Sequence, residues 1–314
     1  MEVLKVLKYT LKRGIISLLT VWVIITITFF LMRSIPGDPF TDEKKIPPEI
    51  MANLEAKYGL DKPLIVQYGV YLKNLVQGDL GESMKYKSRS VNSILTTGFP
   101  VSAKLGLMAA ALGTGLGVVG GIIAALYRGK KFDYFIIILA VIGVSVPNFV
   151  FAALFQYGFG SKLGWFPVAR WGTPKHYVLP VLSLGLGMVA YIARMMRTSM
   201  LDVLNQDYVK TAKAKGLSKS AVVIKHTVRN AILPIITILG ALIAGVVVGS
   251  FVIESIYAIP GIGGYYVQSI QESDYTLILG TTVFYACILV FMMYIIDIIY
   301  GLVDPRIRLD RNGK

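Results

Sequence analysis

Residues 206–234 read QDYVKTAKAKGLSKSAVVIKHTVRNAILP, a basic and helix-prone stretch between two apolar runs that are candidates to cross a bilayer. Alanines and a glycine, Gly216, separate its positive charges. A membrane pore built only from spanning helices has no evident need for such a segment in the aqueous phase. The stretch therefore predicts a pore on which a cytoplasmic partner acts, so the chain is expected to be one part of a larger machine.

Composition places the chain among polytopic membrane proteins. Its 314 residues are 55% hydrophobic, the mean hydropathy is +0.64, and the net charge is nevertheless +14. A spanning helix needs ~20 largely apolar residues to cross ~30 Å of hydrocarbon. We therefore expect an all-α membrane protein with six transmembrane helices, at residues 14–32, 105–127, 134–161, 177–193, 230–253 and 275–296.

Charge distribution predicts the orientation. With the N-terminus inside, the cytoplasmic segments hold 19 Lys and Arg against 6 Asp and Glu, whereas the outer segments hold 11 against 11. Positively charged loops stay in the cytoplasm. We therefore expect a multi-pass protein of the cell membrane with both termini cytoplasmic. The basic excess is read as orientation and contact with anionic lipid, so we expect membrane lipid and no nucleic acid as a partner.

Several classes of function find no support in the sequence. The chain contains no GxxxxGK[ST], HExxH or GxSxG motif, so we expect no enzyme, no catalytic residue, no cofactor and no metal site. The lone cysteine, Cys287, lies within the sixth predicted span and excludes a disulfide within the chain. The first 33 residues resemble a signal peptide, but no small-x-small cleavage pattern follows, and we expect an uncleaved first span.

The outer segment after the first span is long enough to fold. IPGDPF at 35–40 ends the helix, 48–58 reads as a helix that Gly59 stops, and Asp61 and Pro63 open a second helix. The apolar positions of this second helix are Leu64, Tyr68, Tyr71, Leu72 and Leu75. We expect a helical cap, which either touches a soluble partner or closes the outer mouth, or only packs on the bundle.

Some patterns inside the spans have ordinary structural interpretations. Gly113, Gly117 and Gly121 are typical of close helix packing, which we favour over a pore-lining role. Pro147 predicts a kink in the third span. Aromatic residues at 162–176 are expected as interface anchors. The prolines and glycines of ESIYAIPGIGGYY at 254–266 predict a tight re-entrant turn. Asp297 is expected to form an ion pair with Arg306 or Arg308, in preference to a proton relay.

The stretch 206–234 also resembles the signature of a known family. Lys210, Thr211, Ala212 and Gly216 occupy the positions of the EAA-x3-G signature of permease subunits of ABC importers. The form YVKTAKAKGL followed by HTVRNAILP is similar to the peptide and nickel branch. Lys210 stands where the signature is acidic and Thr211 where it has its first alanine, a variation that resembles the branch's own pattern.

The resemblance extends along nearly the whole chain. An ordered set of motifs is similar to the first of the two permease subunits of oligopeptide ABC importers, the binding-protein-dependent transport system inner-membrane components. The motifs are IPGDPF, PPEIMANLEAKYGLDKP, GDLGES, FPVSAKLG, ARMMRTSMLDVL, ESIYAIPGIG and DPRIR. The resemblance implies a type I ABC importer permease fold. It also implies a complex with a second homologous permease, two cytoplasmic ATPase subunits and an extracytoplasmic peptide-binding protein.

The resemblance divides the chain into segments and gives the basic stretch a role. We expect the N-terminus and first helix at 1–33, the cap at 34–100, the transmembrane domain at 101–303 with its coupling segment at 206–230, and a cytoplasmic tail at 304–314. A helix that docks in an ATPase groove is short, small-sided and sharply ended. The expected coupling residues are Lys210, Thr211, Ala212, Lys213, Ala214, Lys215, Gly216 and Leu217. Ala212 and Ala214 then allow close docking, and Gly216 forms the turn. Lys210, Lys213 and Lys215 suit an acidic rim on the ATPase groove.

Other readings remain open at this point. Within the same class, the chain carries dipeptides or nickel in place of oligopeptides. In a different class, it is an ion-coupled secondary transporter, although that class predicts paired charges inside the membrane and an inverted repeat. The basic segment itself can also be read as a surface helix that is attracted to lipid headgroups.

Overall fold

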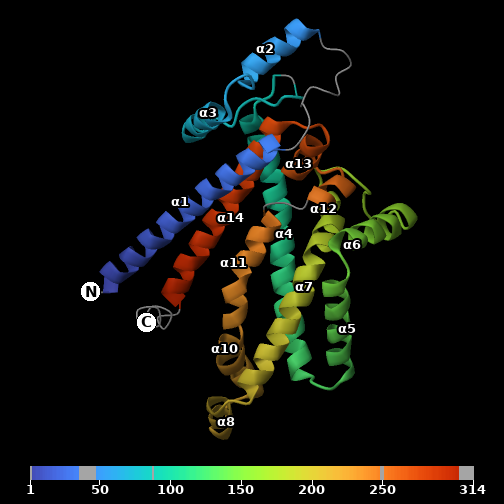
Figure 1. Cartoon of the computed structure of the whole chain (residues 1–314). Coiled ribbons are helices and arrows are strands. Elements are labelled where there is room, and N and C mark those ends of the chain that lie inside the picture. Colours follow the sequence, from blue (N-terminus) through green and yellow to red (C-terminus); the bar gives the residue numbers. More distant parts are fainter. Residues whose placement is uncertain (1, 35–46, 87, 248–250, 304–314) are drawn as a thin grey trace. The chain divides into compact units, whose positions relative to one another are not determined.

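The computed structural model describes residues 2–34, 47–86, 88–247 and 251–303, and most of these residues lie in helices (Figure 1). Within them, the pairing outside helices is a single β-bridge between Glu82 and Ser90. The chain divides into two compact units. One holds Met1–Pro100 and Gly261–Phe291, and the other holds Val101–Pro260 and Met292–Lys314.

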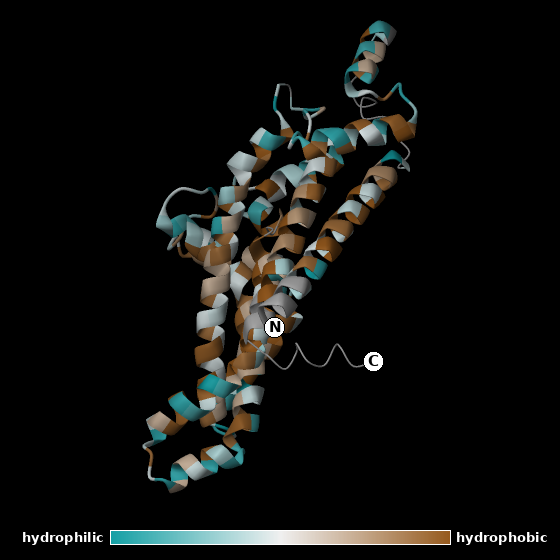
Figure 2. Cartoon of the chain, turned by 90° about the vertical axis from the view of Figure 1, so that its left-hand side faces the viewer, coloured by the Kyte–Doolittle hydropathy of each residue, from teal (hydrophilic) through white to brown (hydrophobic). Residues whose placement is uncertain are grey.

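Four straight helical stretches are long and apolar enough to cross a membrane, and two bent helix pairs bring the number of possible spans to six. In Figure 2 the middle parts of the long helices are mostly hydrophobic, and hydrophilic residues gather toward their ends. Each predicted span overlaps one of these stretches, so the prediction of an all-α protein with six spans is confirmed. The straight stretches are Tyr9–Ser34, Val91–Leu126, Pro174–Leu204 and Tyr275–Ile298.

The third span differs from its prediction. α5 (Lys131–Ser145) ends before Pro147, α6 (Asn148–Phe155) begins after it, and the chain turns by 105° between them. A π-helical segment, η1 (Gln156–Lys162), follows directly. Proline lacks a backbone N–H and keeps the preceding residue out of the helical region, and Val146 is extended with ψ 125°. The predicted kink was therefore wrong, since Pro147 separates two helices.

The fifth span is also interrupted. Lys219–Ala231 and α11 (Leu233–Val247) meet at a bend of 50°. Pro234 occupies the second position of α11, where its missing N–H leaves no helical hydrogen bond unmade. Residues 248–250 lie outside the described part of the chain, and α12 (Phe251–Ile256) follows them. The predicted run 230–253 is therefore distributed over several helical pieces.

In the first unit, the cap helices follow their predicted boundaries. After α1 (Glu2–Ser34), α2 (Pro48–Tyr58) ends at Gly59, whose φ of +66° is the left-handed conformation that glycine adopts without strain. Gly59 N–H donates to the carbonyl of Ala56, and Leu60 N–H donates to that of Glu55. These two bonds form a Schellman motif, so the predicted stop at Gly59 is confirmed. The IPGDPF stretch at 35–40 lies outside the described residues.

α3 (Leu64–Val76) packs on α1 through aromatic rings. Tyr71 stacks on Phe29 with 5.5 Å between ring centroids, and the Tyr68 hydroxyl lies 2.6 Å from the Thr26 hydroxyl. Phe29 is almost fully buried, whereas Leu64 is 50% exposed. Tyr68 and Tyr71 of the predicted apolar stripe therefore pack on α1, whereas Leu64 at its start is exposed.

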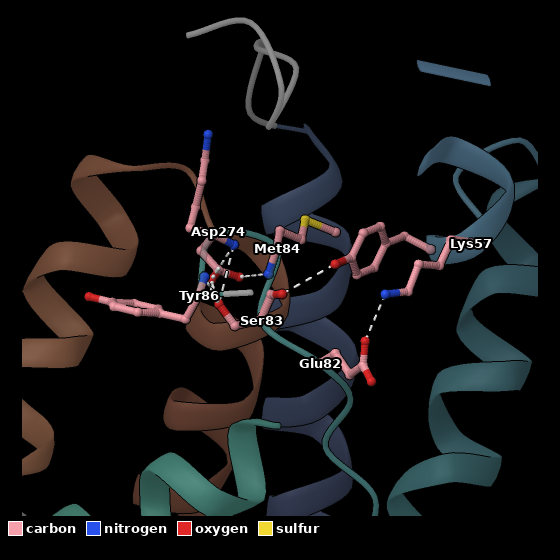
Figure 3. A network of polar contacts seen from close by, with 8 residues as sticks. Lys57, Glu82, Ser83, Met84, Tyr86 and Asp274 are labelled. Carbon is pink, nitrogen blue, oxygen red and sulfur yellow. Dashed lines mark hydrogen bonds and ion pairs between the residues drawn. The ribbon is translucent and has the colours of Figure 1, made fainter. Parts of the chain in front are cut away.

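A buried carboxylate joins distant parts of the first unit (Figure 3). Asp274 precedes α14 (Tyr275–Val303) and accepts hydrogen bonds from the Leu277 N–H at 3.0 Å, from the Met84 N–H at 3.1 Å and from the Ser83 hydroxyl. It thus caps α14 and fixes the segment that contains the GDLGES motif. α13 (Ile262–Gln271) completes the unit.

The second unit is organised around α7 (Pro174–Leu204), which extends past Arg194 as expected. α4 (Val91–Leu126) begins 14 residues before the predicted span and packs on α7 through its glycines. A Cβ placed on Gly113, Gly117 or Gly121 comes within 2.5–2.8 Å of Met188, Ile192 or Met196. These helices approach as closely as their backbones allow, which confirms the predicted packing role.

An ion pair joins α5 to the same helix. Arg197 donates from two guanidinium nitrogens to the two carboxylate oxygens of Asp133, the Nη2–Oδ2 distance being 2.8 Å. Asp133 is buried and also accepts from the Gly129 N–H at 2.8 Å. The bidentate geometry adds specificity to the strength of a charged hydrogen bond. This pair fixes the position of α5 against α7 near the 128–133 turn.

The aromatic loop at 162–176 contributes to the core of the second unit. Phe166 and Trp171 pack against a buried cluster that contains Tyr257, whereas Trp165 is 60% exposed. The Tyr257 hydroxyl donates to the Ala152 carbonyl at 3.0 Å, and burial raises the pKa of this phenol. The aromatic residues of the loop therefore include packing residues as well as candidates for interface anchors.

We predict that Gly121→Leu destabilises the protein by about 1–3 kcal/mol. The new Cβ meets the Ala193 carbonyl oxygen at 2.6 Å, and backbone cannot rotate away. Thermal unfolding in detergent measures the loss. Gly115→Leu on the same helix is the control, because a Cβ there meets nothing within 4 Å. Equal melting temperatures for the two variants would contradict the packing interpretation.

Asp133→Asn is expected to cost about 2–3 kcal/mol, because Arg197 loses its charged acceptor in a site that water reaches only partly. The free energy of unfolding can be measured by denaturant titration of the purified chain. Asp207→Asn removes an ion pair whose side chains are 66% and 95% exposed, and we expect little change. A similar loss in both variants contradicts a special role for Asp133.

Candidate functional site

The basic segment of the sequence forms a short helix and a turn at the end of α7 (Figure 1). α8 (Asp207–Ala214) starts three residues after α7 and packs on η2 (Val222–Val228), a π-helical segment. Val209, Ala212 and Val222 form a small buried cluster together with Val203 of α7. The helix is thereby held by an apolar inner face and leaves its other faces to solvent.

Gly216 forms the turn that ends α8. Its φ is +76°, its N–H donates to the Lys213 carbonyl at 3.0 Å, and the Leu217 N–H donates to the Ala212 carbonyl at 3.4 Å. These bonds form a Schellman motif in which the glycine position needs the left-handed conformation. A Cβ at Gly216 meets nothing within 4 Å. Glycine is therefore favoured at this position because of the backbone conformation, and not because a larger side chain would lack space.

The two alanines of the segment have different surroundings. Ala212 is 5% exposed and packs within the buried cluster, so its small side chain lets α8 approach this chain's own η2. Ala214 is exposed. The expectation that both alanines face a docking groove is therefore wrong for Ala212, because the amphipathic helix turns that position inward.

The exposed side chains of the segment are partly apolar and partly basic. Tyr208 is 44% exposed, Leu217 43% and Ile224 65%. Thr211 is exposed, and its hydroxyl donates to the Asp207 carbonyl. The Lys210 ammonium pairs with Asp207 at 2.8 Å. The remaining exposed cations are Lys213, Lys215, Lys219, Lys225 and Arg229. Isolated exposed apolar residues are common, but three large ones in one short segment are typical of a protein contact.

The segment is anchored in the spanning helices. α9 (Lys219–Ala221) begins at Ser218, whose hydroxyl accepts from the Ala221 N–H at 3.3 Å, and continues through η2 into α10 (Arg229–Ala231). The Ser199 hydroxyl of α7 donates to the Ala231 carbonyl at 2.7 Å. Met196 and Met200 of α7 share a buried cluster with Ala231 and Ile235. The segment is therefore in direct contact with α7 and continuous with the helices that lead into α11.

Two other sequence predictions have different outcomes. Within the predicted turn at 254–266, Pro260 and Gly261 lie between helices, but Gly263 and Gly264 belong to α13, so the turn is shorter than expected. Arg306 and Arg308, the predicted partners of Asp297, lie outside the described residues.

Sequence reasoning missed the apolar docking candidates Tyr208 and Ile224. A helical-wheel plot of α8 and of η2 would have separated these two residues from the buried valines.

Family models match both parts of the chain. The model described as the binding-protein-dependent transport system inner membrane component matches residues 117–309. The model for the N-terminal part of such membrane components matches residues 6–103. Together they include the cap helices, the spans and the basic segment.

Curated relatives match over nearly the full length. The chain is 50% identical to the dipeptide transport system permease protein DppB of Bacillus subtilis, with 98% of this chain and 99% of the relative covered. It is 46% identical to the oligopeptide transport system permease protein OppB of Haemophilus influenzae and 43% identical to OppB of Escherichia coli K12. In both cases 96% of this chain and 99% of the relative are covered.

Solved structures share the fold at low sequence identity. The MetNI methionine ABC transporter in an inward-facing conformation matches with a TM-score of 0.54 at 15% identity, over 67% of this chain and 96% of that chain. A structure of an amino acid ABC transporter with histidines matches with a TM-score of 0.52 at 16% identity, over 68% and 94%. The chain belongs to the family of binding-protein-dependent transport system inner membrane components.

Proposed function

We propose that this protein is a permease subunit of an ATP-driven importer of short peptides. The observation that carries the proposal is the full-length similarity to permease proteins of oligopeptide and dipeptide transport systems. The multi-pass helical fold and the anchored basic segment support it. Membership of this family also argues against the alternative of an ion-coupled secondary transporter.

The proposed complex contains a second homologous permease, two cytoplasmic ATPase subunits and an extracytoplasmic peptide-binding protein. ATP then binds to and is hydrolysed on the ATPase subunits, so this chain is a pore subunit and no enzyme. The charge distribution supports an orientation with both termini and the 206–230 segment in the cytoplasm. In this orientation 34–100 is the extracytoplasmic cap, 101–303 the transmembrane domain, and 304–314 a cytoplasmic tail.

The coupling segment is proposed to dock in a groove of one ATPase subunit. Tyr208, Leu217 and Ile224 supply the apolar contact, and the surrounding lysines complement an acidic rim. Ala212 supports the helix from inside, and Gly216 ends it. When the ATPase moves, α8 and the turn push on α7 and α11 through the Val203, Ser199 and Ala231 contacts, which shifts the pore between its two access states.

The substrate is proposed to be an oligopeptide, with dipeptides as the second candidate. The relative that is 50% identical is a dipeptide permease, and the relatives that are 46% and 43% identical are oligopeptide permeases, so the similarity favours peptides as a class. Uptake of a labelled tetrapeptide in the presence of unlabelled dipeptide, tetrapeptide or nickel separates the candidates. Competition by the tetrapeptide alone supports the proposal, and competition by nickel contradicts it.

Gly216→Val is predicted to uncouple the importer. A β-branched residue at φ +76° costs about 1–3 kcal/mol, which shifts the turn out of its docking conformation. We expect at least about a fivefold loss of both peptide uptake and peptide-stimulated ATP hydrolysis in the assembled complex.

Gly129→Val is the matched control for this prediction. Gly129 has φ +74°, has open space around its Cβ position, and lies on the same side in the proposed topology. It carries the same backbone strain outside the coupling segment, and we expect coupling to be retained. Normal uptake and normal stimulated hydrolysis in an assembled Gly216→Val complex would overturn the docking role of this turn.

Ile224→Ser is predicted to weaken ATPase binding without loss of folding. The side chain is 65% exposed, so its removal leaves the buried contacts intact, and retention of the ATPase subunits in a pull-down should fall severalfold. Ile65→Ser in α3 removes a side chain of 68% exposure from the cap and is expected to leave ATPase retention unchanged. Equal retention by both variants excludes Ile224 from the contact.

A further inference from the structure

The first unit contains a cavity of about 340 Å³. Its walls come from the C-terminal end of α1, from α2 and the turn after it, from α3, from the 79–84 segment and from the first turns of α14. This volume lies in the range of small-ligand sites. The proposed coupling segment does not contribute to it, so the cavity is separate from the function proposed above.

Arg33 is one of the cationic residues that line this cavity, together with Lys57 and Lys62. Its guanidinium carbon lies 5.6 Å from the ring centroid of Phe29 and 6.0 Å from that of Tyr275. Its Nε is buried, and within the described residues no oxygen accepts a hydrogen bond from this nitrogen. Burying a charged donor without an acceptor is costly. The position is therefore suited to an anion that comes from outside the described chain.

Two further polar atoms of the cavity are buried without a partner in the described residues, the Tyr71 hydroxyl and the Gln67 Oε1. Burial raises the pKa of Tyr71 above its ordinary value, so the phenol remains a donor. Gln67 Nε2 donates to the carbonyls of Lys62 at 2.7 Å and Leu60 at 3.3 Å, which fixes its oxygen as the free acceptor. The lining of the cavity thus contains donors for an anion and one free acceptor.

The walls of the cavity are held in place before any ligand arrives. The Lys57 ammonium pairs with Glu82 at 2.8 Å, and this pair joins α2 to the 79–84 segment (Figure 3). The Asp274 network fixes the same segment from the other side. Lys57 and Glu82 neutralise each other, and among the described lining residues Arg33 and Lys62 then stand against one further acidic residue, Asp79. The lining therefore retains a positive charge.

The depth of the cavity identifies the source of the anion. Arg33 is one residue from the end of the Tyr9–Ser34 span, and Tyr275 starts the α14 span. Phe29 and Leu279 line the cavity from about 6–8 Å inside these two ends, at 1.5 Å of rise per residue. Near them, α1 exposes Ile27, Phe30 and Leu31. The phosphates of a bilayer lie at the level where spanning helices end, and the exposed apolar side chains of α1 offer surface for acyl chains.

We propose that this cavity binds the phosphate-bearing headgroup of a phospholipid, in the leaflet at the C-terminal end of α1. Arg33 and Tyr71 donate to the phosphate oxygens. Gln67 accepts from a hydroxyl or ammonium group of the headgroup. Planar guanidinium groups suit phosphate because their fixed N–H pairs match its oxygens. The acyl chains lie along the exposed apolar side chains of α1.

The test is a lipid titration of the full-length chain in detergent, followed by native mass spectrometry. The probe is phosphatidylglycerol, and the measured quantity is the dissociation constant of the tightest bound lipid. We expect Arg33→Gln to weaken it at least about tenfold and Tyr71→Phe to weaken it by about threefold or more. Arg89→Gln is the matched control, because Arg89 also stacks on a tyrosine, Tyr265, but lies outside the cavity. Its lipid affinity should equal that of the unchanged chain.

Each other outcome overturns the proposal. Equal affinity for diacylglycerol, which lacks the phosphate, shows that the headgroup is not recognised. Full competition by inorganic phosphate at equal concentration assigns the cavity to a free anion. Displacement of the lipid by an acidic peptide at lower concentration assigns it to a protein partner. Tyr71→Phe removes a single oxygen and keeps the ring stacking, so unchanged affinity in this variant contradicts the assigned donor even where Arg33→Gln fails to fold.

Discussion

The close approach of α4 to α7 is the contact on which the second unit depends. In a bilayer, apolar surface does not drive helices together, because lipid is as apolar as leucine, so association needs tight packing and polar contacts. Gly113, Gly117 and Gly121 provide the packing, and Gly106 brings α4 equally close to the backbone of α11 at Val246. α7 then holds α5 through Arg197 and α10 through Ser199. One helix therefore gathers the contacts of its neighbours.

This arrangement joins the short 206–230 segment to the spanning helices. α8 is not an independent loop, since its inner face of Val209 and Ala212 packs with Val203 of α7 and Val222 of η2. Packed interiors transmit displacement because they contain little free volume. The outer face, with Leu217 and Ile224, is exposed. The inner face of α8 thus holds the element against this chain, and the outer face is the one proposed to contact an ATPase.

Much of this structure could be predicted from the sequence, because the signals concerned are local. Apolar runs of about 20 residues indicated the spans, and Gly59 and Gly216 indicated helix ends, since the left-handed conformation is a property of one residue. The break at Pro147 was underestimated, because whether a proline kinks or ends a helix depends on what surrounds it. The inward direction of Ala212 and the Asp133–Arg197 pair depend on contacts across 10 to 64 residues, and no local pattern encodes them. The Arg33 cavity likewise joins helices that are distant in the sequence.

The π-helical stretch η2 determines which way the side chains after it face around the helix axis, relative to those before it. A π-helical turn corresponds to an α-helix with one extra residue, and one residue corresponds to about 100° of rotation around the helix axis. The buried Thr227 hydroxyl bonds to the Val222 carbonyl five positions earlier, in keeping with this wider turn. Loss of one residue between Val222 and Val228 would restore an α-helix while rotating Ile224 by roughly a quarter of a turn against Ala231. The surface proposed to meet the ATPase and the surface that meets α7 would then no longer face their partners together.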